Sequence, residues 1–496
     1  MSIPFSIRQH GFHNISGPGG VTGFQLLVQS PYYRGVWFSL IEGVDVTVDG
    51  ETFDNSKTRF KLGERTYTWA EMETIGDKLW PWLEPATVIV DKPGGLKPGV
   101  HDVAVVIKIR ISYMPFNPVG HFANAKLVLM PTAPELAALP KPRLAASLYS
   151  YNGDLQAGTM TLEQCLGDLA DMGAEGFEFL PEAIIPGYPN PSEAWLKQWF
   201  AWLEKYKLTP IAVDGSCDTK LYKSRKLTAQ EIADLIIADL KLAHRLGCKG
   251  YRGMGSSWPA ALGVSGNVSV KSEWTTGITP FEIYDKVLPT AEKLDVRIGE
   301  ELHIPFLIKS EWLHQTIDYI NKRSTRHLGF VPDMSIFVRR PPKSLDPEQF
   351  VQRGLARKVV DYILQAREQL VPEHEAKSKV QEMGGGTPAL QLTAMIYHLS
   401  YSTRERNEPE QLKELIPYIV HIHGKCYEIA EDLSDENSIP YNEIVPVLAC
   451  GGYNGFISTE YEGDRAPYAA SQQVRRQQLM IRQQWAKALH ATAAGF

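Results

Sequence analysis

Eight short apolar runs alternate with longer amphipathic stretches from about residue 144 onward. The runs are RLAASLYS, AEGFEFLPE, TPIAVDG, KGYRGMG, VRIGEELHIPF, HLGFVPDMSIF, YIVHIHGKCYEI and GFISTEYEG. Intervening stretches such as TLEQCLGDLADMG and TAQEIADLIIADLKLAHRLGC place apolar residues at helical spacing behind a threonine suited to an N-cap. Eight strand–helix units over about 350 residues predict an α/β fold, the (β/α)8 TIM barrel.

An open, doubly wound sheet is the alternative architecture for the same alternation. A glycine-rich phosphate loop after one of the runs, such as G-x-G-x-x-G, would favour it. The eight runs carry no such loop, and the glycines of EMGGGTPAL do not follow a predicted strand. The sequence therefore favours the barrel.

The first 130 residues consist instead of short β-rich runs broken by Gly, Pro and Asp, such as GVWFSLI, VDVTVDGETF and AKLVLMP. The pair Asp49-Gly50 predicts a hairpin with a two-residue type I′ turn. We therefore expect an all-β, sandwich-like domain over residues 1–130. The stretch PTAPELAALPKPR, residues 131–143, has several prolines and no hydrophobic period, which predicts a linker before the barrel domain at 144–496.

Composition excludes several classes of partner. The net charge of −6 and the absence of a basic tract argue against nucleic acid. No run reaches the roughly 18 apolar residues of a membrane helix, and the first residues do not resemble a signal peptide. The five cysteines form no C-x-x-C pair, so neither a disulfide framework nor a thiolate zinc site is indicated. We expect a cytoplasmic protein without a membrane partner.

The last four runs carry acids and imidazoles near their carboxyl ends, where chemistry is expected in such a barrel. Glu301 and His303 are two residues apart, which puts both on one face of a strand. The later runs supply Asp333, His421, His423, Glu460 and Glu462. Ionised carboxylates are costly to bury without a cation, so their convergence predicts a divalent metal site. Carboxylates with one imidazole and no thiolate suit Mn²⁺, Mg²⁺ or Co²⁺ better than a structural zinc.

The motifs EELH, VPDMS, HIHGK and STEYEG resemble those of the xylose-isomerase-like barrels in the sugar phosphate isomerase/epimerase superfamily. The resemblance implies one divalent metal ion, with Mn²⁺ preferred over Mg²⁺ or Co²⁺. The implied ligands are Glu301, Asp333, His423 and Glu460. His423 is chosen over His421 because the family's ligand precedes a small x-Gly or x-Lys type of turn. Ile336 stands where many sugar epimerases of this group carry a second histidine.

The stretches SPYYRGVWFSLIEGVDVTVDGE, TYTWAEM, DKPGGLKPGVHDVAVVI and ISYMPF are similar to the small β subunit of bacterial C-glycoside deglycosidases, and the barrel resembles their large α subunit. Those enzymes are two-chain complexes, so this chain looks like a fusion with the β partner first. The resemblance implies a carbon–carbon lyase acting on 3-keto C-glucosides with a phenolic aglycone such as a flavonoid. It also implies a separate upstream enzyme that oxidises C3 of the glucoside, and we expect a homo-oligomer.

The implied reaction is an elimination. A keto group at C3 acidifies the C2 hydrogen, so a base can remove it while a bound metal stabilises the enediolate and the aglycone leaves from C1. His303 is the predicted base, because it stands beside ligand Glu301 and imidazole titrates near neutral pH. Four further residues would hold the aglycone phenol or the sugar hydroxyls, namely the catalytic candidates His421 and Lys425 and the substrate-binding candidates Glu182 and Arg252.

Three alternative functions stay open at this point. A sister enzyme that cleaves 3-keto O-glycosides would share both domains. A sugar isomerase or epimerase would use the same metal and enediolate but return the proton, and Ile336 weighs against it. A non-catalytic carbohydrate-binding protein is disfavoured by the titratable groups at four strand ends.

Overall fold

The computed structural model describes residues 6–132, 135, 142–218, 221–253, 278–304, 306–340, 342, 347–398, 406–463 and 469–493. The chain divides into two compact units. The first comprises Met1–Leu139, Glu431–Leu433 and Ala466–Leu479, and the second comprises Pro140–Ala430, Ser434–Arg465 and Met480–Phe496. Most of the expected linker lies outside the described residues, so the domain boundaries at 130 and 143 stay a prediction.

The first unit is built from antiparallel sheets. The five-stranded sheet has the order β1 (His13–Gly17), β2 (Gly20–Val28), β9 (Ala86–Asp91), β6 (Thr58–Leu62) and β7 (Arg65–Tyr67). The four-stranded sheet has the order β11 (Val119–Leu129), β10 (Gly99–Ile109), β4 (Ile41–Val48) and β5 (Glu51–Phe53). A short pair joins β3 (Val36–Trp37) to β8 (Leu79–Trp80), and α1 (Trp69–Glu73) is a single turn of helix. The predicted all-β character is confirmed.

Alternating side chains from both larger sheets share one apolar core. Phe24 and Val88 enter it from the first sheet, and Val46 and Val105 enter it from the second. Burial of this surface at roughly 25 cal/mol per Å² is the main force holding the sheets together. The predicted hairpin joins β4 to β5, with positive φ at both turn residues, 50° at Asp49 and 86° at Gly50.

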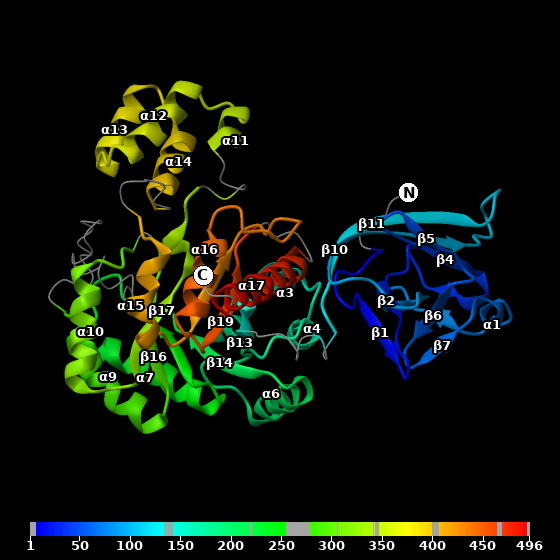
Figure 1. The fold of residues 1–496 in the computed structure, drawn as a ribbon, viewed down its shortest axis with the longest axis horizontal. Coiled ribbons are helices and arrows are strands. Elements are labelled where there is room, and N and C mark those ends of the chain that lie inside the picture. The colour runs from blue at the N-terminus through cyan, green and yellow to red at the C-terminus, as the bar shows by residue number, and fades with distance from the viewer. Residues whose placement is uncertain are drawn as a thin grey trace. The chain divides into compact units, whose positions relative to one another are not determined.

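The second unit is an eight-stranded parallel barrel surrounded by helices (Figure 1). Its strand order is β17 (Leu328–Pro332), β16 (Arg297–Leu302), β15 (Gly250–Gly253), β14 (Thr209–Asp214), β13 (Gly176–Phe179), β12 (Arg143–Ser147), β19 (Phe456–Tyr461) and β18 (Ile422–Cys426). Bridges between Phe330 and Ile419 and between Asp333 and His423 join the two end strands and close the barrel. Each of the eight predicted runs contains one of these strands, which confirms the predicted fold class.

Amphipathic helices follow the strands, as the sequence predicts. They are α3 (Asn152–Ala157), α4 (Leu162–Asp171), α5 (Pro181–Ile184), α6 (Glu193–Tyr206), α7 (Ala229–Arg245), α9 (Pro280–Leu294), α10 (Glu311–Arg323), α15 (Leu412–Leu415), α16 (Tyr441–Cys450) and α17 (Ala469–Ala493). Thr161 and Thr228 form capping boxes with Gln164 and Glu231, which satisfies backbone N–H groups at the starts of α4 and α7.

The connection between β17 and β18 carries helices with an apolar core of their own. It contains α11 (Pro347–Gln352), α12 (Arg357–Glu368), α13 (Glu373–Glu382) and α14 (Thr387–His398), which gather as one group in Figure 1. Val360, Ile363, Val380 and Leu392 are buried among them. In the described part of the chain, no helix combines the length and the apolar character needed to cross a lipid bilayer.

Candidate metal centre

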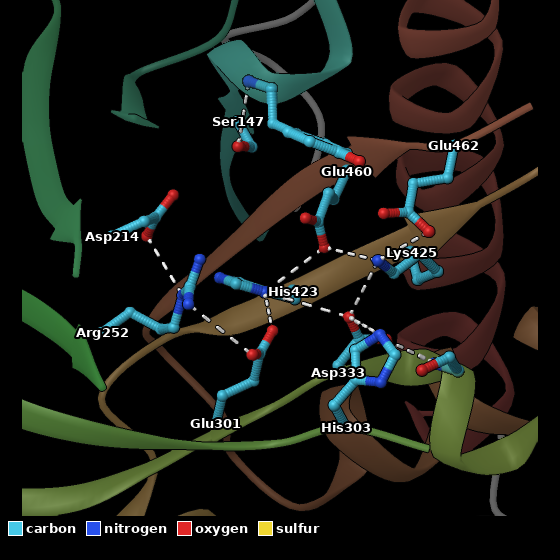
Figure 2. A network of polar contacts seen from close by, with 12 residues as sticks. Ser147, Asp214, Arg252, Glu301, His303, Asp333, His423, Lys425, Glu460 and Glu462 are labelled. Atoms are coloured by element: carbon cyan, nitrogen blue, oxygen red, sulfur yellow. Dashed lines mark hydrogen bonds and ion pairs between the residues drawn. The ribbon is translucent and has the colours of Figure 1, made fainter. Parts of the chain in front are cut away.

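Four buried side chains from consecutive barrel strands converge on one point (Figure 2). Glu301 lies on β16 just before its last residue, Asp333 directly follows β17, His423 lies on β18 and Glu460 lies on β19. One donor atom from each residue lies within 4.8 Å of the other three. The structure thus brings together the four residues expected as metal ligands, and their role as ligands stays a prediction.

The imidazole of His423 faces the three carboxylates through one ring nitrogen. Its Nδ1 lies 3.0 Å from Oε1 of Glu301, 3.3 Å from Oε2 of Glu460 and 3.9 Å from Oδ2 of Asp333. Asp333 is oriented by its other oxygen, because Oδ1 accepts the backbone N–H of Ser335 at 2.7 Å, at the start of the 3-10 helix η3 (Met334–Phe337). Oδ2 is thereby turned toward the cluster.

Lys425 is buried beside the cluster and pairs with three carboxylates. Its Nζ lies 3.0 Å from Oε2 of Glu460, 3.2 Å from Oε2 of Glu462 and 3.3 Å from Oδ2 of Asp333. The parallel register pairs Lys425 directly with Glu460, which fixes their side chains next to each other. The predicted catalytic residue Lys425 therefore lies in the site, with only 1% of its side chain exposed.

Arg252 of β15 lies between two acids of the barrel interior. Its Nη1 is 3.8 Å from Oε2 of Glu301, and its Nε is 3.6 Å from Oδ1 of Asp214. Burial opposes ionisation of Glu301, but the Arg252 guanidinium and His423 outweigh it and lower the pKa of Glu301 to about 2. Burial and the nearby Glu178 raise the pKa of Asp214 to about 8. The arrangement keeps Glu301 ionised, as a metal ligand requires.

His303 lies at the edge of the cluster, two residues beyond Glu301. Its Nδ1 is 3.0 Å from the backbone oxygen of Ile304. A carbonyl oxygen can only accept, so Nδ1 is the donor in this contact, and the neutral form of the ring then has its lone pair on Nε2. Nε2 is 4.0 Å from Oδ2 of Asp333, and 28% of the side chain is exposed. The structure therefore places a partly exposed imidazole next to the proposed ligands.

His421 and Glu178 form a second buried group behind His423. His421 Nε2 lies 2.6 Å from Oε2 of Glu178, and His423 Nε2 lies 3.1 Å from the same oxygen. Burial lowers the pKa of His421, which favours the neutral imidazole. The predicted catalytic residue His421 is only 2% exposed, and it contacts Glu178 and does not belong to the four-donor cluster.

Sequence reasoning missed Glu178 and Asp214. In GFEF, Phe177 and Phe179 pack on Trp199 of α6, with ring centroids 5.5 and 5.2 Å apart, so the alternation of the strand turns Glu178 inward. That alternation is the signal that could have identified Glu178. Asp214 is the last residue of β14 and is followed by a glycine. An Asp-Gly pair is equally typical of a turn, so the sequence did not mark Asp214 as a site residue.

Glu182, predicted to bind substrate, does not belong to the four-donor cluster. It lies in α5 with an exposed side chain, and its Oε1 accepts the hydroxyl of Ser216 at 2.7 Å. Ser216 follows β14, so this pair links the segments after two neighbouring strands.

The donor set fits a divalent cation. Three buried carboxylates and one imidazole point at a common centre, and the carboxylates of the site outnumber its two permanent cations, Lys425 and Arg252. Oδ2 of Asp333 and Oε2 of Glu460 share the single ammonium of Lys425, so one cation faces both of these carboxylates. Oxygen donors with a single nitrogen suit Mn²⁺, Mg²⁺ or Co²⁺, and described sulfur atoms do not take part.

A barrel with this site belongs to the class of folds that place acid–histidine chemistry at the carboxyl ends of parallel strands. Residues 5–113 match the family model of the C-glycoside deglycosidase beta subunit. The beta subunit of a C-glycoside deglycosidase from Eubacterium cellulosolvens is 38% identical over 110 residues, 22% of this chain and 75% of that subunit.

The remainder of the chain is similar to deglycosidase alpha subunits. The alpha subunit of a 3'-dehydrocarminate deglycosidase from Microbacterium sp is 25% identical over 344 residues, 66% of this chain and 90% of that subunit. Among solved structures, L-ribulose 3-epimerase aligns at 12% identity and a TM-score of 0.42, over 71% of this chain and 97% of that one. The chain belongs to the C-glycoside deglycosidase family, with its beta-subunit-like part first, which confirms the expected family.

Proposed function

We propose that this protein is a divalent-metal-dependent carbon–carbon lyase that cleaves the C-glycosidic bond of 3-keto C-glucosides. The observation that carries the proposal is the placement of Nε2 of the His303 imidazole beside the cluster of Glu301, Asp333, His423 and Glu460. A base next to a Lewis-acid site is the arrangement that removal of a proton adjacent to a carbonyl requires. The name of the Microbacterium relative, a 3'-dehydrocarminate deglycosidase, supports a substrate already oxidised at C3.

Each group has a defined task in this reaction. A divalent cation held by the four ligands would supply a Lewis acid that stabilises the negative charge of the enediolate. His303 takes the C2 proton through Nε2, while its Nδ1 proton stays bound to the carbonyl of Ile304. The C1–C2 double bond then forms as the bond between C1 and the aglycone breaks. The departing aglycone carbon takes up a proton, which balances the proton lost from C2.

Buried residues support these groups and do not face the substrate in our proposal. Lys425 holds Asp333 and Glu460 in place through its ion pairs, and Arg252 does the same for Glu301. We assign both residues a positioning role, although the sequence alone suggested direct contact with the substrate. Glu182, which is exposed beyond β13, remains the candidate for contact with a sugar hydroxyl or the aglycone.

Product analysis tests the proposal directly. Protein loaded with Mn²⁺ is incubated with a 3-keto C-glucoside, with its 3-hydroxy parent and with the matching 3-keto O-glucoside, and the products are identified by mass spectrometry. We expect free aglycone from the 3-keto C-glucoside and none from the 3-hydroxy parent. Isomerised or epimerised sugar with the aglycone still attached would contradict the proposal. Release from the O-glucoside alone would identify the sister activity instead.

A further inference from the structure

The side chain of Glu178 is fully buried on β13 and belongs neither to the predicted ligands nor to the residues that face the substrate. Its Oε2 is the point on which two imidazoles converge, His421 at 2.6 Å and His423 at 3.1 Å. Both contacts use Nε2 of the histidine. An ionised carboxylate is purely an acceptor, so both nitrogens donate a proton to it.

The two nitrogens of His423 therefore face different partners. Nδ1 faces Glu301, Asp333 and Glu460, and Nε2 faces Glu178. A neutral imidazole has one N–H and one lone pair, so a proton on Nε2 leaves the lone pair on Nδ1. That is the nitrogen pointing at the centre of the cluster.

We propose that Glu178 is a positioning residue that holds His423 in the Nε2–H tautomer and thereby presents Nδ1 as a metal ligand, with His421 as the second donor to the same carboxylate. This inference rests on the metal centre of the proposed function. A carboxylate on the second nitrogen of a ligating histidine fixes the ring and raises the basicity of its lone pair, and its loss typically weakens metal binding by about 10–100-fold.

Glu178, His421 and His423 also have donor atoms close enough to suggest an ion of their own. The distances favour hydrogen bonds. Two ligands bonded to one tetrahedral ion at 2.0–2.1 Å stand roughly 3.3 Å apart, whereas Glu178 and His421 are 2.6 Å apart. That spacing matches a charge-assisted N–H···O bond, so this group orients the centre and does not hold a second ion.

The test measures metal affinity and the tautomer of the ring, and it does not depend on turnover. Mn²⁺ is titrated by electron paramagnetic resonance into the full chain and its Glu178→Gln variant. The matched control is Glu175→Gln, because Glu175 directly precedes the same strand and pairs with Arg143 outside the cluster. We expect the dissociation constant to rise by about 10–100-fold in Glu178→Gln and to stay unchanged in the control.

A spectroscopic signature separates positioning from general stability. In protein labelled with ¹⁵N-histidine and loaded with ¹¹³Cd²⁺, the cadmium should couple to Nδ1 of His423, and Nε2 should carry a proton. Coupling to Nε2 would overturn the inference, as would unchanged affinity in Glu178→Gln. If that variant does not fold, the spectrum of the wild type decides alone. Glu178-dependent metal binding without cleavage of glycosides would overturn the proposed function and leave this inference intact.

Discussion

Nζ of Lys425 lies 3.0 Å from Oε2 of Glu460, and the two residues are direct partners in the register of β18 and β19. The ammonium also pairs with Asp333 and Glu462, so one cation compensates three carboxylates in the interior of the barrel. The backbone register thus brings a permanent cation next to two of the proposed metal ligands. Removing the Lys425 ammonium would test how much of this negative charge a bound metal ion could compensate.

The first prediction concerns Lys425→Met. The change leaves buried carboxylates without their cation, and breaking a buried pair costs about 3–5 kcal/mol in the free energy of unfolding. We expect a lower melting temperature for the metal-free variant and a larger rise on addition of Mn²⁺ than in the wild type, both measured by calorimetry. Lys413→Met, which removes an exposed ion pair with Glu410, is the control and should change little. An equal metal-induced rise in both variants contradicts this account.

The second prediction concerns the metal itself. We expect one divalent ion per chain after loading with Mn²⁺, measured by elemental analysis of the dialysed protein. Asp333→Ala removes an oxygen donor from the four-residue cluster and should abolish stoichiometric binding and activity. Asp318→Ala, an exposed acid on α10, should retain both. Undiminished activity in Asp333→Ala would exclude this centre.

The third prediction assigns the proton acceptor. His303→Gln should keep its metal and bind the 3-keto glycoside, but lose roughly 10² or more in kcat, the usual scale of general base catalysis. With an analogue whose aglycone cannot leave, the variant should fail to exchange the C2 hydrogen in deuterated solvent. His314→Gln on α10, whose imidazole binds the backbone oxygen of Ser310, is the matched control. Retained exchange in His303→Gln, with the metal bound, would place the base elsewhere.

The fourth prediction uses a buried acid outside the site. Burial raises the pKa of Asp239 on α7 from 3.8 to about 6, and the hydroxyl of Tyr188, 3.2 Å away, only partly opposes this. The folded state therefore holds this proton more tightly than the unfolded chain, and stability falls as the pH rises from about 4 to about 6. Asp239→Asn should be neutral at pH 4 and stabilising above pH 6, by up to about 3 kcal/mol. Calorimetry at both pH values checks the sign. If Asp239→Asn is stabilised as much at pH 4 as at pH 7.5, the raised pKa of Asp239 is not the cause and the prediction is refuted.

Much of the fold was predictable because its pattern is periodic. Each barrel strand is a short apolar run between helical stretches, and the donors Glu301 and His423 stand out because they interrupt such runs with charge or imidazole. Glu178 interrupts its run in the same way, between Phe177 and Phe179, but the sequence prediction did not include the inward face of that run. The packing of both phenylalanines on Trp199 shows that Glu178 points to the other side of β13.

The sequence could not predict which side chains contact each other in the site, for a different reason. Which strand ends face each other depends on barrel closure, and closure joins residues far apart in the chain. The position of Arg252 between Glu301 and Asp214, or of Lys425 among three acids, follows from register and not from spacing. The spacing in the sequence could identify these residues as candidates. It could not show whether each one contacts the substrate or holds a proposed metal ligand in place.

The bridge between Asp333 and His423 closes the barrel across the segment that contains α11–α14. Joining distant parts of a chain costs loop entropy and slows folding, although the cost grows only with the logarithm of loop length. Helices with their own apolar core can fold first and shorten the loop that remains to be closed. Because these same two residues supply two of the four proposed donors, the proposed metal site is complete only when this contact of the barrel has formed. A metal ion bound by this cluster would therefore report closure of the barrel, because a chain in which this contact is open lacks the paired donors Asp333 and His423.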